Sequence, residues 1–176
     1  MRPARRGSPR FSARMATLSW EGILNLGPSR LGMLLLRCSS SAKSVNELLR
    51  LGGRFEGMLF ISPKAVRSRK ELEAAFALAS AAFREKTNIS PKLSNEALLF
   101  LACETNFASA ARKAGTSSTD DFAIVSQEKI PIATLRKKLL LAKAETINLG
   151  EWGKKKGAYF EAELAIERMA LSRIKN

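Results

Sequence analysis

Few residues of this chain are of the types that do chemistry, and their spacing is unfavourable for it. The 176 residues include no histidine, which excludes Ser-His-Asp and Cys-His catalysis and histidine zinc sites. Cys38 and Cys103 lie far apart in sequence and predict neither a disulfide scaffold nor a metal cluster. Cys103 ends an apolar run, which is typical of a small buried side chain. Asp120 and Asp121 lie in a polar loop, where aspartate commonly stabilises a turn. We therefore expect no enzymatic activity, no cofactor and no metal.

Two glycine-containing stretches resemble phosphate-binding loops. Gly27 and Gly32 have the first spacing of a P-loop, but Met33 and Leu34 follow where lysine and serine or threonine are required. The stretch 150–153, Gly-Glu-Trp-Gly, precedes three lysines and is similar to the loop that clamps nucleic-acid backbone in KH domains. That loop joins two helices, whereas a strand is expected here. A flexible basic loop and a phosphate-contacting loop of another fold both remain open.

Basic charge dominates the composition. Thirty Lys and Arg face 16 Asp and Glu, giving a net charge of +14 and a pI of about 10.4. Such an excess predicts an acidic partner, most often nucleic acid. The cations gather in four clusters: 64–70, 112–113, 136–143 and 154–156. We expect nucleic-acid binding by the last of these, with the second as support: Lys154, Lys155, Lys156, Arg112 and Lys113.

The first 32 residues differ in composition from the rest of the chain. They hold six arginines and one acid, are rich in proline and serine, and show no steady hydrophobic period. We expect a disordered extension outside the fold, either a start assigned too early or a targeting segment of the mitochondrial type. A third alternative is a short helix that docks on the domain through Trp20, Ile23, Leu24 and Leu26. The expected location is cytoplasmic, or mitochondrial if this segment is a transit peptide.

The remaining chain, residues 33–176, predicts one helix-rich α/β or α+β domain around a small mixed sheet. Apolar runs predict strands at 33–38, 55–61 and 122–125, with a weaker one near 145–149. Capping residues and helical spacing predict helices at 44–49, 68–84, 91–103, 107–114, 131–140 and 159–174. The longest uncharged apolar run, 74–83, is about half a membrane span, so no membrane association is expected.

The order of these elements resembles a known family over residues 33–174. An apolar helix, 93–103, is followed by a polar connection and a short helix that ends at Gly115. The closing helix contains Glu163-Leu-Ala-Ile-Glu-Arg-Met-Ala-Leu171. These features are similar to the small kinase-binding subunit of the KEOPS complex, called the PRPK-binding protein in eukaryotes. Archaeal relatives typically have glycine, glutamate or glutamine, arginine, glutamine and isoleucine in the connection, where this chain has Cys103-Glu104-Thr105-Asn106-Phe107.

The resemblance implies a non-catalytic subunit that binds the N-lobe of a small atypical kinase/ATPase. The complex threonylcarbamoylates adenosine 37 of tRNA, and in archaea this subunit recruits tRNA by its 3′ end. Because Thr105 replaces the family's arginine, we expect tRNA binding here to depend on diffuse charge. Contacts to the other KEOPS subunits would be indirect. We expect the kinase to meet apolar residues of the helices 91–103 and 159–174: Phe100, Tyr159, Phe160 and Met169.

The alternative is a stand-alone basic nucleic-acid-binding protein, such as an organellar ribosome-associated factor. The arginine-rich first segment favours this alternative. Association with a small kinase separates the two, since a ribosomal factor would have no such partner.

Overall fold

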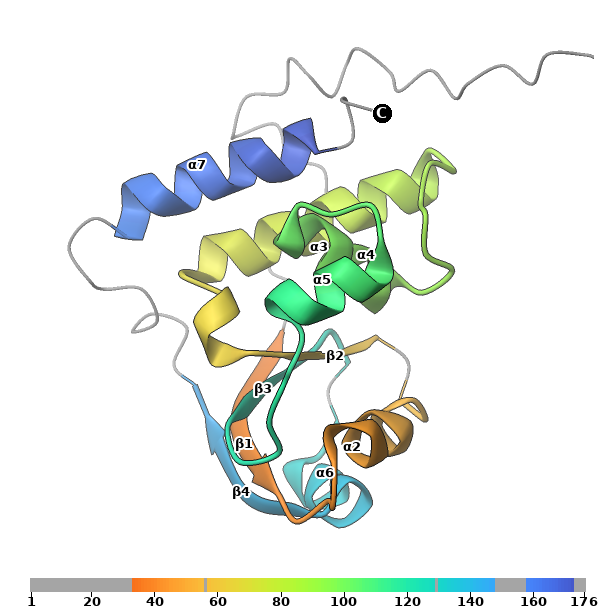
Figure 1. The fold of residues 1–176 in the computed structure, drawn as a ribbon, viewed down its shortest axis with the longest axis vertical. Helices are drawn as coiled ribbons and strands as arrows, with labels where there is room; N and C mark the ends of the chain where they lie inside the picture. The colour runs from red at the N-terminus through yellow and green to blue at the C-terminus, as the bar shows by residue number, and fades with distance from the viewer. Residues whose placement is uncertain (1–32, 56, 129, 148–157, 173–176) are drawn as a thin grey trace, which may run out of the picture.

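The computed structural model describes residues 33–55, 57–128, 130–147 and 158–172, and for 158–163 the backbone alone. The described strands form a four-stranded sheet. Helices lie on both sides of this sheet (Figure 1). None of the helices in these ranges is long and apolar enough to cross a membrane. The elements in chain order are β1 (Leu34–Ser40), α2 (Val45–Gly52), β2 (Met58–Ile61), the short 3₁₀ helix η2 (Pro63–Ala65), α3 (Arg69–Arg84), α4 (Leu93–Ala102), α5 (Phe107–Ala114), β3 (Phe122–Ser126), α6 (Ile132–Leu139), β4 (Leu141–Thr146) and α7 (Ala158–Leu171).

The sheet has the strand order β2-β3-β1-β4, and every neighbouring pair is antiparallel. The domain is therefore α+β, and the expectation of a mixed sheet is wrong. The central strand β1 pairs Leu36 with Ile124 of β3 on one side and with Thr146 of β4 on the other. Two neighbouring strands can run parallel only if the connection between them crosses back to the end of the sheet where the first strand began. No neighbouring strands of the described sheet are parallel.

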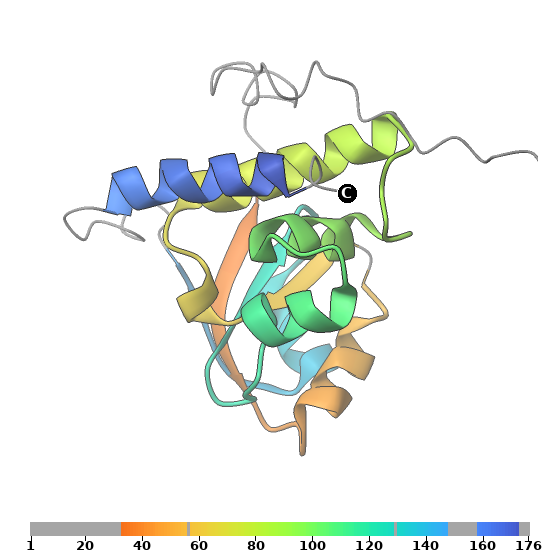
Figure 2. The same cartoon turned by 45° about the horizontal axis from the view of Figure 1, so that its top comes forward.

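The side chains of each strand alternate between two apolar cores, one on each face of the sheet. Leu35 and Val125 face a core shared with α3, α4, α5 and Met169 of α7. Leu36 and Ile124 face a second core shared with α2 and α6. Figure 2 shows the resulting layers, with α7 lying along α3 on the outside of the larger one. The sheet is thus covered on both faces, and β2 and β4 are its outer strands within the described chain.

Helix α4 lies at the centre of the larger layer, which corrects one expectation. Eight of its ten residues are buried, so the helix offers no free apolar face. Phe100 is 1% exposed and Met169 is fully buried, and both belong to the core between the sheet and helices α3, α4 and α7. The prediction that Phe100 and Met169 contact the kinase is therefore wrong for the folded domain. Both residues are needed to fill this core.

Local capping signals position three of the six described α-helices as the sequence predicts, whereas α4 begins at Leu93, two residues after the expected Pro91, with no side-chain cap. At the starts of α2 and α3, the hydroxyl groups of Ser44 and Ser68 each accept a hydrogen bond from the backbone N–H of the residue three positions ahead. Asn106 does the same for α5, accepting from the N–H of Ser109 at 3.1 Å. The strands differ more from expectation. β2 begins only at Met58, after the left-handed Gly57 (φ 71°), and β4 begins at Leu141 rather than near 145.

Candidate nucleic-acid and partner interface

The connection between α4 and α5 is a tight turn built around Cys103. This residue ends α4 in the left-handed conformation, with φ of 54°. Its N–H donates to the carbonyl of Phe100, and the N–H of Glu104 donates to that of Leu99, both at 2.9 Å. These two bonds are a Schellman motif, which satisfies the last carbonyl groups of a helix. Asn106 then caps α5, so the polar connection is ordered by hydrogen bonds at both ends.

The two cations predicted on α5 differ in how they are used. Lys113 donates from Nζ to Oε1 of Glu104 at 2.5 Å and to the carbonyl of Ala102 at 3.2 Å. It therefore ties α5 back to the end of α4, and Glu104 offsets its charge. Arg112 is exposed, and within the described chain its side chain donates a hydrogen bond only to Oγ of Ser109, at 3.2 Å. Of this pair, Arg112 is better placed for a phosphate group.

Five of the other residues selected from the sequence are outside the described part of the structure. Lys154, Lys155 and Lys156 lie in the segment 148–157, between β4 and α7. Tyr159 and Phe160 belong to α7 by their backbone, but their side chains are not described. The expected roles of these five residues remain predictions.

A second basic surface lies on the opposite side of the sheet, on α6. Leu135 and Leu139 anchor this helix in the smaller core, and the residues between them are exposed. Arg136 donates to the carbonyl of Ala144 at 3.4 Å, while Lys137 and Lys138 make no ion pair with any described residue. The sequence marks these cations as a cluster but cannot distinguish a paired cation from a free one. Cations also suit the last turn of a helix, where carbonyl groups concentrate negative charge.

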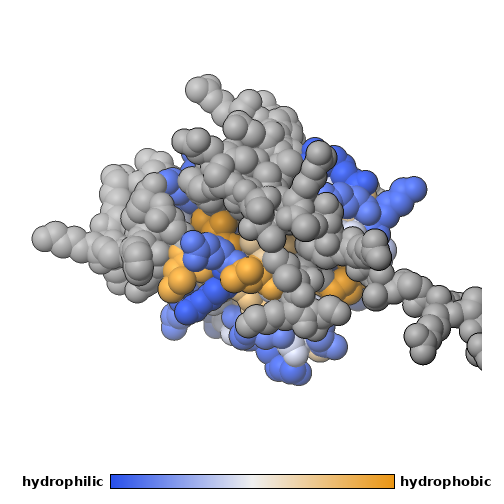
Figure 3. Space-filling model, turned by 90° about the horizontal axis from the view of Figure 1, so that it is seen from above, coloured by the Kyte–Doolittle hydropathy of each residue, from blue (hydrophilic) through white to orange (hydrophobic). Residues whose placement is uncertain are grey.

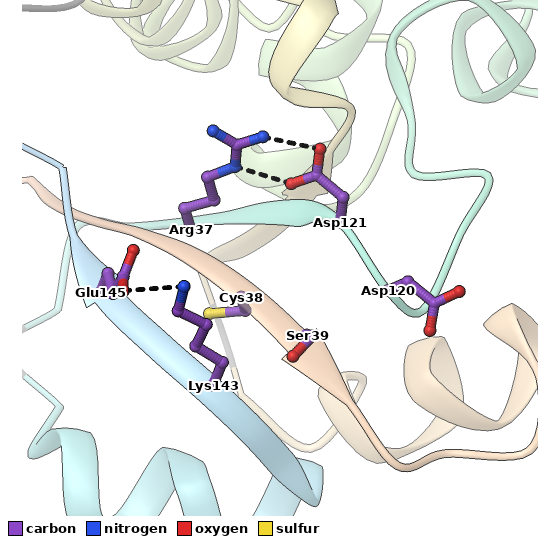
Figure 4. A pocket seen from close by; sticks show the side chains of 7 residues that line it. All are labelled: Arg37, Cys38, Ser39, Asp120, Asp121, Lys143 and Glu145. Carbon is purple, nitrogen blue, oxygen red and sulfur yellow. Dashed lines mark hydrogen bonds and ion pairs between the residues drawn. The ribbon is translucent and has the colours of Figure 1, made fainter.

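A hollow of about 360 Å³ lies over β1 and β4, and Figure 4 shows it to be lined by charged side chains. Arg37 donates to both carboxylate oxygens of Asp121, at 2.7 and 2.9 Å, and Lys143 pairs with Glu145 at 3.0 Å. The hydrogen bond from Arg37 lowers the pKa of Asp121, which is thus held ionised. Asp120 points away from this pair (Figure 4). An acid–base dyad needs two neighbouring carboxyl groups with separated pKa values, so we interpret the hollow as an ion-paired surface of the sheet.

Neither cysteine has the environment of a reactive thiol. Burial raises the pKa of Cys38 to about 12, and burial also raises the pKa of Cys103. A nucleophilic cysteine needs the opposite, a thiolate stabilised near neutral pH. Among the described residues, no group of three potential metal ligands comes together. Cys103 serves the turn after α4, and Cys38 fills the smaller core.

Helix α7 carries two exposed leucines within the described part of the chain. Ile166 and Met169 face inward, whereas Leu164 and Leu171 are 39% and 50% exposed. These two leucines are seven residues apart, so they lie on one side of the helix two turns apart. Figure 3, in which the molecule is seen from above, shows patches of hydrophobic residues between hydrophilic ones.

No family model matches the chain, and no curated protein sequence matches it either.

Proposed function

We propose that this chain is a non-catalytic subunit of the KEOPS tRNA-modification complex, which binds a small atypical kinase/ATPase and helps to recruit tRNA. The observation that carries the proposal is the backbone at Cys103. This residue stands where archaeal relatives typically have glycine, and it adopts the left-handed conformation that glycine adopts most readily. Only two other described non-glycine residues, Lys86 and Leu140, have positive φ. The family pattern thus has glycine at a position where this backbone favours it.

The second glycine position of the family pattern also supports the proposal. At Gly115 a Cβ atom would lie 2.5 Å from the carbonyl oxygen of Ala111, closer than real Cβ contacts allow. Gly115 also bridges Ile61 of β2, so the close approach joins the helical layer to the sheet. A glycine at the end of this short helix is therefore a packing requirement. The pattern of helix, turn, helix and glycine has a physical basis in this chain.

The outer side of α7 supplies a surface for the kinase. In place of Phe100 and Met169, which are buried, we assign this role to Leu164 and Leu171. Their exposure in a folded domain is unfavourable by itself, and a partner that covered them would gain their hydrophobic burial. Tyr159 and Phe160 belong to the same helix and remain part of the proposed surface as sequence-based expectations.

Binding to a kinase is the direct test. Titration calorimetry with the purified kinase/ATPase from the same source is expected to show a stoichiometric complex. The double variant Leu164→Glu, Leu171→Glu should remove binding, because two charges would be buried at the interface. Leu140→Glu is the matched control, since Leu140 is also exposed but follows α6 on the other side of the sheet. Absence of a complex with the wild-type chain would refute the proposal.

A stand-alone nucleic-acid-binding protein is the second candidate, favoured by the two lysines of α6 that pair with no described acid. The test measures RNA affinity against salt concentration for the wild type, for Lys137→Ala, Lys138→Ala, and for the triple alanine variant of Lys154, Lys155 and Lys156. For each phosphate that a variant no longer neutralises, the log–log slope should flatten by about 0.9 on duplex RNA, taking the DNA value, or about 0.7 on a single strand. RNA binding without any kinase binding would favour this candidate. Overlapping titrations of all three proteins would show that these lysines are only solvated.

A further inference from the structure

A groove of about 290 Å³ runs along the outer edge of β2 and has no role in the function proposed above. Leu59 faces the larger core, whereas Met58 and Phe60 face the smaller one, yet all three line this groove. A hollow that touches residues from both faces of a strand must lie at the edge of that strand. Since β2 ends the strand order, this edge is not paired with any other strand of the described sheet.

The edge of β2 presents backbone groups to the groove. The N–H of Ser62 donates to the carbonyl of Ala114 at 3.0 Å, which shows that the peptide groups of Ser62 point away from β3. Peptide groups in a strand alternate with period two, so those of Phe60 and Met58 point to the same outer side. The segment around Gly115 covers only the Ile61 end of the strand. Beyond it, no hydrogen bond from the described loops or side chains reaches the N–H groups of Met58 and Phe60. Unpaired strand edges readily pair with another strand.

Helices α2 and α5, one from each layer, flank the edge, and we call their bordering residues, Leu49 and Phe107, the two lips of the groove. On α2, Leu49 is 44% exposed and borders the groove, and on α5 Phe107 is 48% exposed and borders the other side. Leu98 and Ala111 also line the groove and extend its apolar wall. An added strand would direct alternate side chains toward the α2 lip and the α5 lip. The groove is therefore shaped for an extended segment with large apolar side chains at alternate positions.

The charges around the groove restrict its occupant further. No acidic residue lines it within the described chain, and Lys92 does. Arg54 and Arg112 are exposed and each adjoins a lining residue, Gly53 or Ala111. A second copy of this chain, with its own net charge of +14, would be repelled by this rim. A nucleic-acid strand would bring one charge per nucleotide to a groove lined by one cation.

We propose that this groove binds an extended segment of a partner protein as a fifth strand beside β2. The segment has large apolar side chains at alternate positions and at least one carboxylate group. Main-chain hydrogen bonds to Met58 and Phe60 provide affinity, and the lips of Leu49 and Phe107 provide specificity, as in other cases of strand addition. The proposal does not depend on the identity of the kinase or of the RNA.

The test selects peptides from a phage-displayed library of random dodecapeptides against the full chain. The expected winners alternate large apolar residues and carry aspartate or glutamate. A synthetic winner should slow amide hydrogen exchange at Met58 and Phe60, and N-methylation of its alternate peptide groups should abolish binding. Phe107→Glu and Leu49→Glu should each weaken binding by at least about tenfold, because each places a carboxylate against an apolar anchor. The matched control Leu140→Glu, 46% exposed and outside the lining of the groove, should bind like the wild type.

Four outcomes would overturn the proposal. The first is a selection that enriches no sequence, and the second is a winner whose affinity neither lip variant changes. The third is a wild-type dimer in sedimentation that Phe107→Glu dissociates, since the occupant would then be a second copy. The fourth is single-stranded RNA that protects Met58 and Phe60 from exchange and loses affinity in Phe107→Glu. Circular dichroism of the lip variants shows whether they keep the fold, which we expect because both side chains are exposed.

Discussion

Replacing Gly115 by alanine tests whether the close approach after α5 holds the helical layer to the sheet. The Cβ atom would lie 2.5 Å from the oxygen, 3.1 Å from the Cα and 3.2 Å from the carbonyl carbon of Ala111, all of them backbone atoms. A flexible side chain could move aside, but the end of α5 cannot move without disturbing the bridge from Gly115 to Ile61. The backbone angles of Gly115, φ −68° and ψ 165°, suit alanine, so the effect is steric alone.

The expected magnitude follows from two opposing terms. Overpacking of this kind costs about 1–3 kcal/mol of folding free energy. Alanine also restricts the unfolded chain, which returns about 0.4–1 kcal/mol. A net loss of about 1–2 kcal/mol corresponds to a fall in Tm of about 2–8 °C for a domain of this size. Urea denaturation measures the loss directly, and an unchanged m-value shows that the same surface unfolds.

Gly53 provides the matched control. It lies in the right-handed helical region, and its added Cβ would meet Leu49 oxygen at 3.4 Å, an ordinary contact. Gly53→Ala should therefore be neutral or stabilise by about 0.4–1 kcal/mol. If Gly115→Ala is as stable as Gly53→Ala, the steric reasoning is refuted, and with it the claim that glycine is required after α5.

Three further predictions concern the turn after α4 and two buried acids. Cys103→Gly should be tolerated. Cys103→Val should be less stable than the glycine variant by at least about 1 kcal/mol, because a β-branched residue is strained at positive φ. Equal stabilities of the two variants would contradict this. Burial raises the pKa of Glu71. Between the usual and the raised pKa, the folded state therefore holds a proton that the unfolded state has lost. The stability of the folded state consequently falls as the pH rises through this range. Glu71→Gln lacks this titrating group. The stability of the variant relative to wild type, measured by denaturation, should therefore be higher at pH 7 than at pH 4. A difference that does not change with pH would refute this. Glu96 is fully buried and accepts from the N–H groups of Ile89 and Ser90, so Glu96→Ala should cost about 2–4 kcal/mol in a melting experiment, and a loss under about 0.5 kcal/mol would exclude that role.

Local signals in the sequence determined most of the secondary structure. The caps at Ser44, Ser68 and Asn106 act on residues three positions ahead, so their effect does not depend on the rest of the fold. The excess of basic charge and the lack of histidine are likewise properties of composition alone. The strand boundaries do not follow from local signals in this way, because a strand ends where its neighbour stops pairing. Thus β4 begins at Leu141, where pairing with Ser40 of β1 begins.

Only the tertiary structure decided which apolar and charged residues are available to partners. Phe100 and Phe107 are both apolar residues of adjacent helices, yet one is buried and the other is 48% exposed. The difference arises because α4 is enclosed by α3, α5, α7 and the sheet, whereas the start of α5 borders the edge of β2. Lys113 and Lys137 are likewise alike in sequence, but Glu104 pairs with the first alone. Burial and ion pairing depend on residues distant in the chain, and the antiparallel strand order that brings these together is not encoded in any local pattern.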